Sequence, residues 1–434
     1  MKRISLVLTA AILCCLHTLA DGRHVQTLKT GWKFTRTDDV AASQTDYDDS
    51  RWQSVTVPHD WAIYGPFDAN NDRQKVAIEQ DGQKEALSHA GRTGGLPFVG
   101  AGWYRLQFEA PEFTEGRRAT LLFDGAMSHA RVWVNGQEAG YWPYGYNAFY
   151  FDITPYMKAG EVNTLAVRLE NYEESSRWYP GAGLYRNVHL IVTDELAVKM
   201  WGTYITTPVV REGFAKVNVQ VELDMPKGID PNTVSVATDI YTADGTAVAG
   251  TVEELTSFDE GVKTLELVVQ QPQLWSPETP YLYRAVTTIM DGKGATTDVY
   301  ETTFGIRTIE FSPEFGMKLN GEKVILKGIA NHHTLGALGA AAYPRAIEKR
   351  IQLLKEYGFN HIRTSHNPYS KSFMQLCDEY GILVVDELYD KWLSSFCGGR
   401  ADWMSLWPRD LPEWVKRDRN HPCVVMWILG NELQ

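Results

Sequence analysis

The 434-residue sequence has few cysteines, no excess of positive charge and no apolar run long enough for a membrane-spanning helix. Two of its five cysteines lie in the first 20 residues, and it contains neither a Cys-x-x-Cys pair nor a His-Glu-x-x-His motif. The cysteine content argues against a disulfide framework, the common zinc motifs are absent, and we expect no metal and no other cofactor. A net charge of −12 and a pI near 5.5 argue against nucleic acid or an anionic membrane as a partner.

The composition is that of a soluble globular protein, with 44% hydrophobic and 22% charged residues. The length suggests about three domains. Aromatic residues make up 12% of the chain, including 14 Trp and 21 Tyr. Flat aromatic faces fill sandwich cores, and they also line sugar-binding clefts because pyranose C–H groups pack against them.

The first 20 residues resemble a cleaved export signal. Lys2 and Arg3 form a basic start, residues 4–19 are largely apolar, and Ala20 ends a small-residue cleavage pattern. We therefore expect a protein that is exported to the periplasm or the extracellular space. Three cysteines follow the signal; Cys377 and Cys423 lie on apolar faces, so they are expected to be buried free thiols, whereas Cys397 has no such context.

Two all-β domains are predicted after the signal. Residues 21–195 contain short runs of β-formers and an Asn135-Gly136 hairpin turn, which favour a jelly-roll sandwich with a long polar insert over residues 70–95. Residues 196–307 continue with alternating strands at sandwich spacing, typical of a small immunoglobulin-like domain that acts as a spacer.

From residue 308 to 434 the pattern changes to alternating strands and helices. Apolar runs predict parallel strands, and faces with helical spacing that end at Gly358 and Gly381 predict the helices between them. The four strands are predicted at residues 324–329, 360–363, 382–386 and 424–429. The segment is about half the length of a (β/α)₈ barrel, so we expect the incomplete first half of a TIM-barrel catalytic domain.

Each of the four predicted strands ends in polar residues, and in a barrel these ends converge on one face. They are His332-His333, the run from Arg363 to Pro368, Asp386-Glu387 and Asn431-Glu432. Two adjacent histidines on a strand end point in opposite directions, so at most one faces the cleft. Asp386-Glu387 is either an acid/base pair or a buried network with Arg363. A buried strand has no structural need for an acid at its tip, which makes Glu432 the strongest catalytic candidate.

These motifs resemble those of glycoside hydrolase family 2, the group of β-galactosidases, β-glucuronidases and β-mannosidases. The resemblance covers essentially the whole chain after the signal, and its most specific part runs from Asn420 to Glu432. It also includes the motifs at residues 102–105, 178–186, 275–283, 304–307, 363–368 and 376–381.

The resemblance implies a retaining mechanism with two carboxyl groups about 5–5.5 Å apart. By motif, Glu432 matches the acid/base and Asn431 the residue that contacts the sugar 2-hydroxyl. His332 and His366 match histidines of the sugar subsite, and Arg363 matches the arginine of the second strand. The nucleophile of the family would lie beyond residue 434.

One departure concerns the stretch after the third strand. The best-known β-galactosidases carry a magnesium-binding Glu-x-His pair there, where this sequence has Asp390, Lys391 and Trp392. No metal is therefore carried over. Trp392 is a candidate sugar platform, and Asp390 is a candidate acceptor for a sugar hydroxyl.

The sequence thus predicts an exported retaining exo-β-glycosidase, most consistent with the β-galactosidase type, present as a truncated chain that lacks its nucleophile. β-Glucuronidase and β-mannosidase remain alternatives, as does a non-catalytic carbohydrate-binding fragment. The expected partner is an oligosaccharide or a simple β-glycoside, and a homo-oligomer of the full-length parent remains open.

Overall fold

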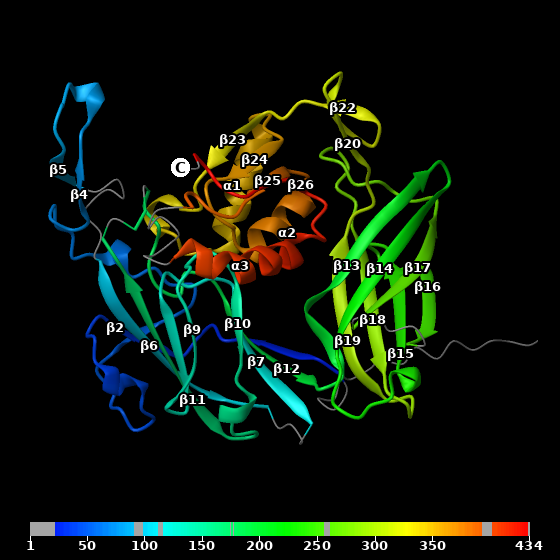
Figure 1. Cartoon of the computed structure of the whole chain (residues 1–434), viewed down its shortest axis with the longest axis horizontal. Coiled ribbons are helices and arrows are strands. Elements are labelled where there is room, and N and C mark those ends of the chain that lie inside the picture. The colour runs from blue at the N-terminus through cyan, green and yellow to red at the C-terminus, as the bar shows by residue number, and fades with distance from the viewer. Residues whose placement is uncertain are drawn as a thin grey trace, which may run out of the picture.

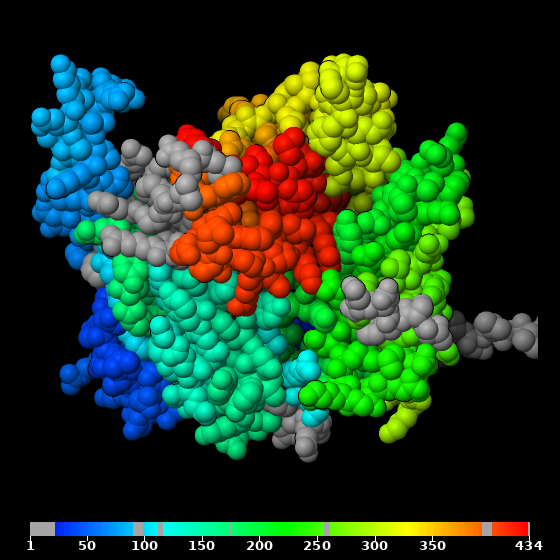
Figure 2. Space-filling view, viewed as in Figure 1, coloured from blue at the N-terminus to red at the C-terminus, as the bar shows by residue number. Residues whose placement is uncertain are grey.

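The computed structural model describes residues 22–90, 99–111, 116–173, 175–176, 178–255, 261–392 and 402–432. The predicted export signal lies outside these ranges. Figure 1 shows two β-sandwiches side by side, with a smaller αβ part above and between them. Figure 2 shows that the αβ part packs directly on both sandwiches. The predicted fold class, a jelly-roll sandwich followed by an immunoglobulin-like sandwich and a partial barrel, is confirmed.

The first sandwich packs a six-stranded sheet against a four-stranded sheet, with the strand orders β3-β2-β6-β11-β8-β9 and β1-β12-β7-β10. The predicted hairpin turn is present, since Asn135 and Gly136 both have positive φ between β8 and β9. The alternating strands bury one core that includes Trp32, Phe123 and Val167. The strands are β1 His24–Thr27, β2 Trp32–Thr35, β3 Gln53–Val55, β6 Gly100–Glu109, β7 Arg117–Phe123, β8 Ala130–Val134, β9 Gln137–Trp142, β10 Phe149–Asp152, β11 Val162–Asn171 and β12 Val188–Asp194.

The polar insert predicted over residues 70–95 contains secondary structure within its described part. Strands β4 (Arg73–Val76) and β5 (Leu87–Ala90) pair as an antiparallel hairpin. The hairpin projects from the first domain as an arm, at the upper left of Figures 1 and 2. Residues 91–98 lie outside the described ranges.

The second sandwich has the sheets β13-β14-β17 and β16-β15-β18-β19. The alternation predicted along β14 is observed, because Val217, Val219, Val221 and Leu223 all face the core. The strands are β13 Ala197–Arg211, β14 Phe214–Asp224, β15 Ser235–Tyr241, β16 Ala247–Glu254, β17 Val262–Gln270, β18 Tyr283–Met290 and β19 Thr296–Phe304.

The third part begins with a small antiparallel sheet, β20 (Ile309–Ser312), β21 (Gly316–Leu319) and β22 (Glu322–Val324). A four-stranded parallel sheet follows, in the order β23-β24-β25-β26. Its strands are β23 Gly328–Asn331, β24 His361–Thr364, β25 Leu383–Glu387 and β26 Val424–Ile428, and its helices are α1 Pro344–Glu356, α2 Lys371–Tyr380 and α3 Trp403–Asp418.

Two features of this part differ from the sequence prediction. The strand predicted at 324–329 is divided, because β22 ends at Val324 and β23 begins only at Gly328. Between them the chain bends to place the Lys327 N–H 2.8 Å from Asn360 Oδ1. Helix α3 was not predicted, because Pro408 and Pro412 lie inside it and proline usually interrupts a helix.

The core of the third part lies between the parallel sheet and its helices. Cys377 and Cys423 are buried free thiols in this core, as predicted, and Cys397 lies outside the described residues. In the part of the chain that the structure describes, no helix combines the length and the apolar character needed to cross a membrane.

Candidate active site

The carboxyl ends of β24, β25 and β26 converge on one ionic network centred on Glu387. Arg363 donates from Nε to Glu387 Oε2 at 3.1 Å and from Nη2 to Oε1 at 2.9 Å. His366 Nδ1 lies 2.9 Å from Oε2 of the same carboxylate. Glu387 is fully buried, whereas Arg363 and His366 are partly exposed. Of the two interpretations of Asp386-Glu387, the structure therefore favours the buried network with Arg363.

Asn431 is held at both ends of its side-chain amide. Arg363 Nη2 donates to Asn431 Oδ1 at 3.1 Å, and Asn431 Nδ2 donates to Asp390 Oδ1 at 2.9 Å. The Asn431 N–H also donates to the Asp390 carbonyl at 2.8 Å. These contacts fix the orientation of the amide and leave the second Nδ2 hydrogen for another acceptor. Asp390 is buried behind Asn431, so its predicted contact with a sugar hydroxyl remains a prediction.

Glu432 is the exposed carboxylate of this face, and Lys391 fixes its position. The Glu432 side chain is 63% exposed, whereas the Lys391 side chain is 9% exposed. Lys391 Nζ donates to Glu432 Oε2 at 2.8 Å and to the backbone carbonyls of Glu432 and Asn431 at 2.9 and 3.2 Å. Glu432 has a φ of +46°, which is uncommon for a residue other than glycine. Sequence reasoning missed the role of Lys391, although it lies between two predicted site residues.

The two adjacent histidines point in opposite directions, as expected. His332 Nδ1 lies 2.9 Å from the Ser365 carbonyl, and its ring lies 5.9 Å from the ring of His366. His333 turns away and donates from Nε2 to the Pro180 carbonyl at 3.1 Å. Burial lowers the pKa of His333 to about 3, so this ring is neutral.

His332 and His366 both direct Nδ1 towards an acceptor. In each ring Nδ1 faces an acceptor, the Ser365 carbonyl or the Glu387 carboxylate, so Nδ1 carries the proton. Imidazole rings suit sugar hydroxyl groups, which can both donate and accept hydrogen bonds.

Trp392, the predicted sugar platform, lies beside the end of β26. Its Nε1 donates to the Leu429 carbonyl at 3.1 Å. One face of its indole packs on Trp403, with ring centroids 5.0 Å apart and planes 19° apart. The platform role of Trp392 would need the opposite face of the indole, and it remains a prediction.

Asp386 lies below the face rather than on it. Its side chain is fully buried and Oδ1 accepts from Thr364 Oγ1 at 3.2 Å. Burial, reinforced by the neighbouring Asp418 carboxylate, raises the pKa of Asp386 well above its usual value. Among the described residues no group of three or more His, Cys, Asp or Glu side chains could hold a metal ion.

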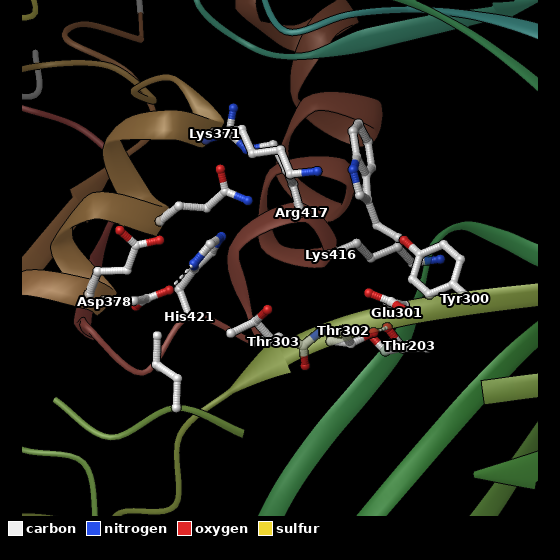
Figure 3. A pocket seen from close by; sticks show the side chains of 15 residues that line it. Thr203, Tyr300, Glu301, Thr302, Thr303, Lys371, Asp378, Lys416, Arg417 and His421 are labelled. Atoms are coloured by element: carbon white, nitrogen blue, oxygen red, sulfur yellow. Dashed lines mark hydrogen bonds and ion pairs between the residues drawn. The ribbon is translucent and has the colours of Figure 1, made fainter. Parts of the chain in front are cut away.

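A separate pocket of about 170 Å³ lies between the second domain and helices α2 and α3 (Figure 3). It includes none of the predicted site residues. Many of its charges are already paired, such as Lys416 with Glu222 at 2.7 Å and His421 with Asp378 at 2.5 Å. We therefore describe it as a polar seam between domains.

An exposed glutamate, an oriented asparagine, two histidines and an arginine lie together at the carboxyl end of a parallel sheet, which is where barrel enzymes carry their catalytic groups. The chain belongs to glycosyl hydrolase family 2. The family's sugar binding domain matches residues 25–194, its second domain matches residues 198–307, and its TIM barrel domain matches residues 314–434.

Curated relatives include the β-galactosidase BoGH2A of Bacteroides ovatus, 39% identical over 97% of this chain and 48% of its own length. A putative β-glucuronidase of Formosa agariphila is 35% identical over 97% of this chain and 39% of its own length. A family 2 member from Bacteroides cellulosilyticus superposes with a TM-score of 0.84 at 36% identity, covering 94% of this chain and 52% of that one. The chain thus spans about half the length of these relatives, or less.

Proposed function

We propose that the protein containing this chain is a retaining exo-β-glycosidase of the β-galactosidase type. The observation that carries the proposal is the pair Asn431-Glu432 at the end of β26, with the amide held by Arg363 and Asp390 and the carboxylate held by Lys391. Relatives named as β-galactosidases support galactose as the sugar, although other relatives are named as β-glucuronidases.

In this proposal Glu432 protonates the leaving oxygen and later takes a proton from the attacking water. Its exposure and its place beside Asn431 suit a group that must reach a glycosidic oxygen. The remaining Nδ2 hydrogen of Asn431 donates to the 2-hydroxyl of the sugar. The His332 and His366 side chains contact other hydroxyls of the sugar.

The nucleophile must be a second carboxylate. Glu387 is a poor candidate because it is fully buried and bound by both Arg363 and His366. We propose that the nucleophile comes from a part of the protein other than the described face, and that residues 1–434 alone therefore do not turn over glycosides.

The charge of the described face suits a neutral sugar better than a uronic acid. Arg363 contacts Glu387 and Lys391 contacts Glu432, so both cations already have a carboxylate partner. A glucuronide carboxylate would have to compete with these partners. This supports galactosides over glucuronides as substrates.

The test compares nitrophenyl β-galactoside, β-glucuronide and β-mannoside as substrates of the whole protein that carries this chain. We expect the galactoside to be hydrolysed fastest. With lactose, whose leaving group needs a proton, Glu432→Gln should lower kcat/KM by roughly 10²- to 10⁴-fold. The control Glu379→Gln, on α2, should change it less than about twofold. Faster hydrolysis of the glucuronide would show that the substrate is a glucuronide and not a galactoside. No hydrolysis of any of the three would contradict the proposal.

The apolar segment at residues 4–19 also leads us to propose that the protein is exported. The test is N-terminal sequencing of the protein recovered from its native host. A mature start close to Asp21 is expected, and a retained Met1 would contradict export by this route.

A further inference from the structure

The backbone of Glu387 is held by a side chain of the neighbouring strand. The parallel ladder between β24 and β25 pairs residues 361–363 with residues 383–385 and ends there. Beyond it, the Glu387 N–H donates to Thr364 Oγ1 at 2.9 Å. Both residues are fully buried. The Thr364 hydroxyl therefore fixes the last residue of β25, which carries the central carboxylate of the ionic network.

The orientation of this hydroxyl depends on Asp386. A threonine hydroxyl has one proton to donate, and its lone pairs accept from other groups. Thr364 Oγ1 accepts from the Glu387 N–H and donates its own proton to Asp386 Oδ1 at 3.2 Å. The acceptor on Asp386 thus keeps the lone pairs of the hydroxyl turned towards Glu387.

Asp386 is itself anchored to helix α3. It hydrogen-bonds to Asp418, which Arg417 holds from Nε at 2.8 Å and from Nη2. Two carboxyl groups contact each other in this way only when one of them carries a proton. Burial, and then the charge of Asp418, raise the pKa of Asp386, so Asp386 is the protonated partner. Among the described residues no donor contacts Asp386 Oδ2, which fits an oxygen that bears the proton.

A displacement of Glu387 would reach the ends of two other strands. Its carboxylate accepts two hydrogen bonds from Arg363, and Oε2 also contacts His366 Nδ1. Arg363 donates in turn to Asn431 Oδ1 at 3.1 Å. The backbone hydrogen bond of one residue therefore affects three side chains of the proposed sugar subsite.

We propose that Asp386 is a positioning residue: through the Thr364 hydroxyl it holds Glu387, and with it the side chains that contact the sugar. The inference rests on the proposed function, because those side chains must bind a sugar. Asp386 lies below the face and does not touch the substrate. It acts as a neutral hydrogen-bonding group, not as a general acid or base.

Three variants test the links of this chain one by one. Asp386→Asn keeps an acceptor oxygen for Thr364 and replaces the acid proton by an amide donor for Asp418. Asp386→Ala removes both groups. Thr364→Val keeps the shape of the side chain and leaves the Glu387 N–H without its acceptor.

The matched control is Thr238→Val, on β15 of the second sandwich. Thr238 is fully buried, as Thr364 is, and its hydroxyl also makes a side-chain hydrogen bond, with Thr287 Oγ1 at 2.9 Å. Both variants therefore lose a buried hydroxyl and its hydrogen bond, so a general loss of stability is common to them. Only Thr364→Val changes the ionic network.

The experiment measures kcat, KM and inhibition by free galactose in the whole protein, with a nitrophenyl β-galactoside as substrate. We expect Thr364→Val and Asp386→Ala to raise KM and the galactose inhibition constant on the order of 10-fold, because misplaced contact groups weaken sugar binding. Asp386→Asn should stay within about threefold of the wild type, because its amide makes the same two hydrogen bonds. Thr238→Val should leave both constants unchanged.

A double variant adds a test of the order of the chain. Asp386→Ala combined with Thr364→Val should have the KM of Thr364→Val alone, because both changes break the same connection and their effects do not add. Thr364→Val and Asp386→Asn decide the question even where Asp386→Ala is too unstable to purify.

The outcomes separate this inference from the proposed function. If the wild type hydrolyses the galactoside and Thr364→Val has the KM of Thr238→Val, the positioning role is wrong and the function stands. If Asp386→Asn is as impaired as Thr364→Val, position 386 needs an ionised carboxylate, and the role of a neutral hydrogen-bonding group is wrong. If the wild type hydrolyses none of the glycosides, both proposals fall.

Discussion

At the scale of single residues, Lys391 determines where the Glu432 carboxylate lies. The ammonium group contacts Oε2 of Glu432 and the two backbone carbonyls of residues 431 and 432. A largely buried lysine that makes three contacts restricts an otherwise exposed side chain. Its main effect should therefore be on the geometry of proton transfer.

We expect Lys391→Met to lower kcat by about tenfold for substrates with poor leaving groups, with little change in KM, because a misplaced acid transfers its proton less effectively. Substrates with nitrophenol leaving groups should be affected less. The control is Lys416→Met, which removes a lysine that contacts Glu222 at 2.7 Å in the domain seam. Equal loss of kcat in both variants, or equal loss on both kinds of substrate, would contradict this role.

At the scale of elements, most of the third part could be predicted from the sequence. Helix α2 begins at its Ser370 cap, which accepts from the Phe373 N–H, and ends at Gly381 in the left-handed conformation. Both signals are local, so they can be recognised in the sequence alone. The apolar runs of β24, β25 and β26 are equally direct evidence, because strands of parallel sheets are typically apolar on both faces.

The parts that were not predicted depend on tertiary contacts. The break between β22 and β23 depends on Asn360, which is 33 residues away in the sequence from Lys327. Helix α3 contains two prolines, and packing of Leu406 and Trp414 against the first domain and the residues that follow β25 overrides the local preference against a helix.

The site could likewise be predicted only in part. Strand-end position identified Arg363, Asn431 and Glu432, because parallel strands place their carboxyl ends together. No sequence pattern indicates that Trp178 contacts the barrel, because Trp178 and His332 are 154 positions apart and belong to different domains. Sequence reasoning recognised the motif around Trp178 but not where its ring lies.

The loop between β11 and β12 gives a prediction with a close control. Gly181→Ala should be more destabilising than Gly245→Ala, although both glycines have a φ of +85°. Both variants incur a backbone cost of roughly 1–2 kcal/mol. At Gly245 nothing lies within 4 Å of the new Cβ, whereas at Gly181 it meets Ala340.

The comparison is made by denaturant unfolding of the two variants, together with KM. Gly181→Ala should also raise KM, because the loop that carries Trp178 is displaced. Equal stability and equal KM in the two variants would show that the close approach to Ala340 has no consequence.

At the scale of the whole molecule, buried acids join the first domain to the barrel. Asp410 of α3 accepts from Asn147 of the first domain at 3.2 Å and from the Tyr389 hydroxyl at 2.7 Å. Burial raises the pKa of Asp410 to about 7 and that of Asp60, which accepts from the Ala340 N–H of the barrel part, to about 6. A carboxyl group whose pKa is raised on folding binds its proton more tightly in the folded state.

The stability from such a group is fully present below the unfolded pKa, near 4, and is lost as the pH rises through the folded value. Asp410 alone should lower the free energy of unfolding by up to about 1.4 kcal/mol per pH unit between roughly pH 4 and 7. Asp410→Asn should remove this part of the slope, because an amide does not titrate. The new amide is tolerated at this position because Asn147 Oδ1 lacks a partner and can accept from it after a flip.

The measurement is denaturant unfolding at pH 5 and at pH 8. The free energy of unfolding of Asp410→Asn minus that of the wild type should be larger at pH 8 than at pH 5. The control Asp46→Asn, at an exposed position, should follow the wild type at both values. A slope that is unchanged in Asp410→Asn would show that this carboxyl group does not titrate as described.

The central claim, that Glu432 is the acid/base of a retaining glycosidase, is tested most directly by azide rescue in the whole protein that carries this chain. The measurement follows Glu432→Ala with a nitrophenyl β-galactoside, a substrate whose leaving group needs no proton, so the first step should still proceed. Added azide should then accelerate turnover, because it attacks the glycosyl-enzyme without base assistance, and the product should be the β-galactosyl azide. Unchanged turnover with azide, or an α-configured azide, would contradict the assignment.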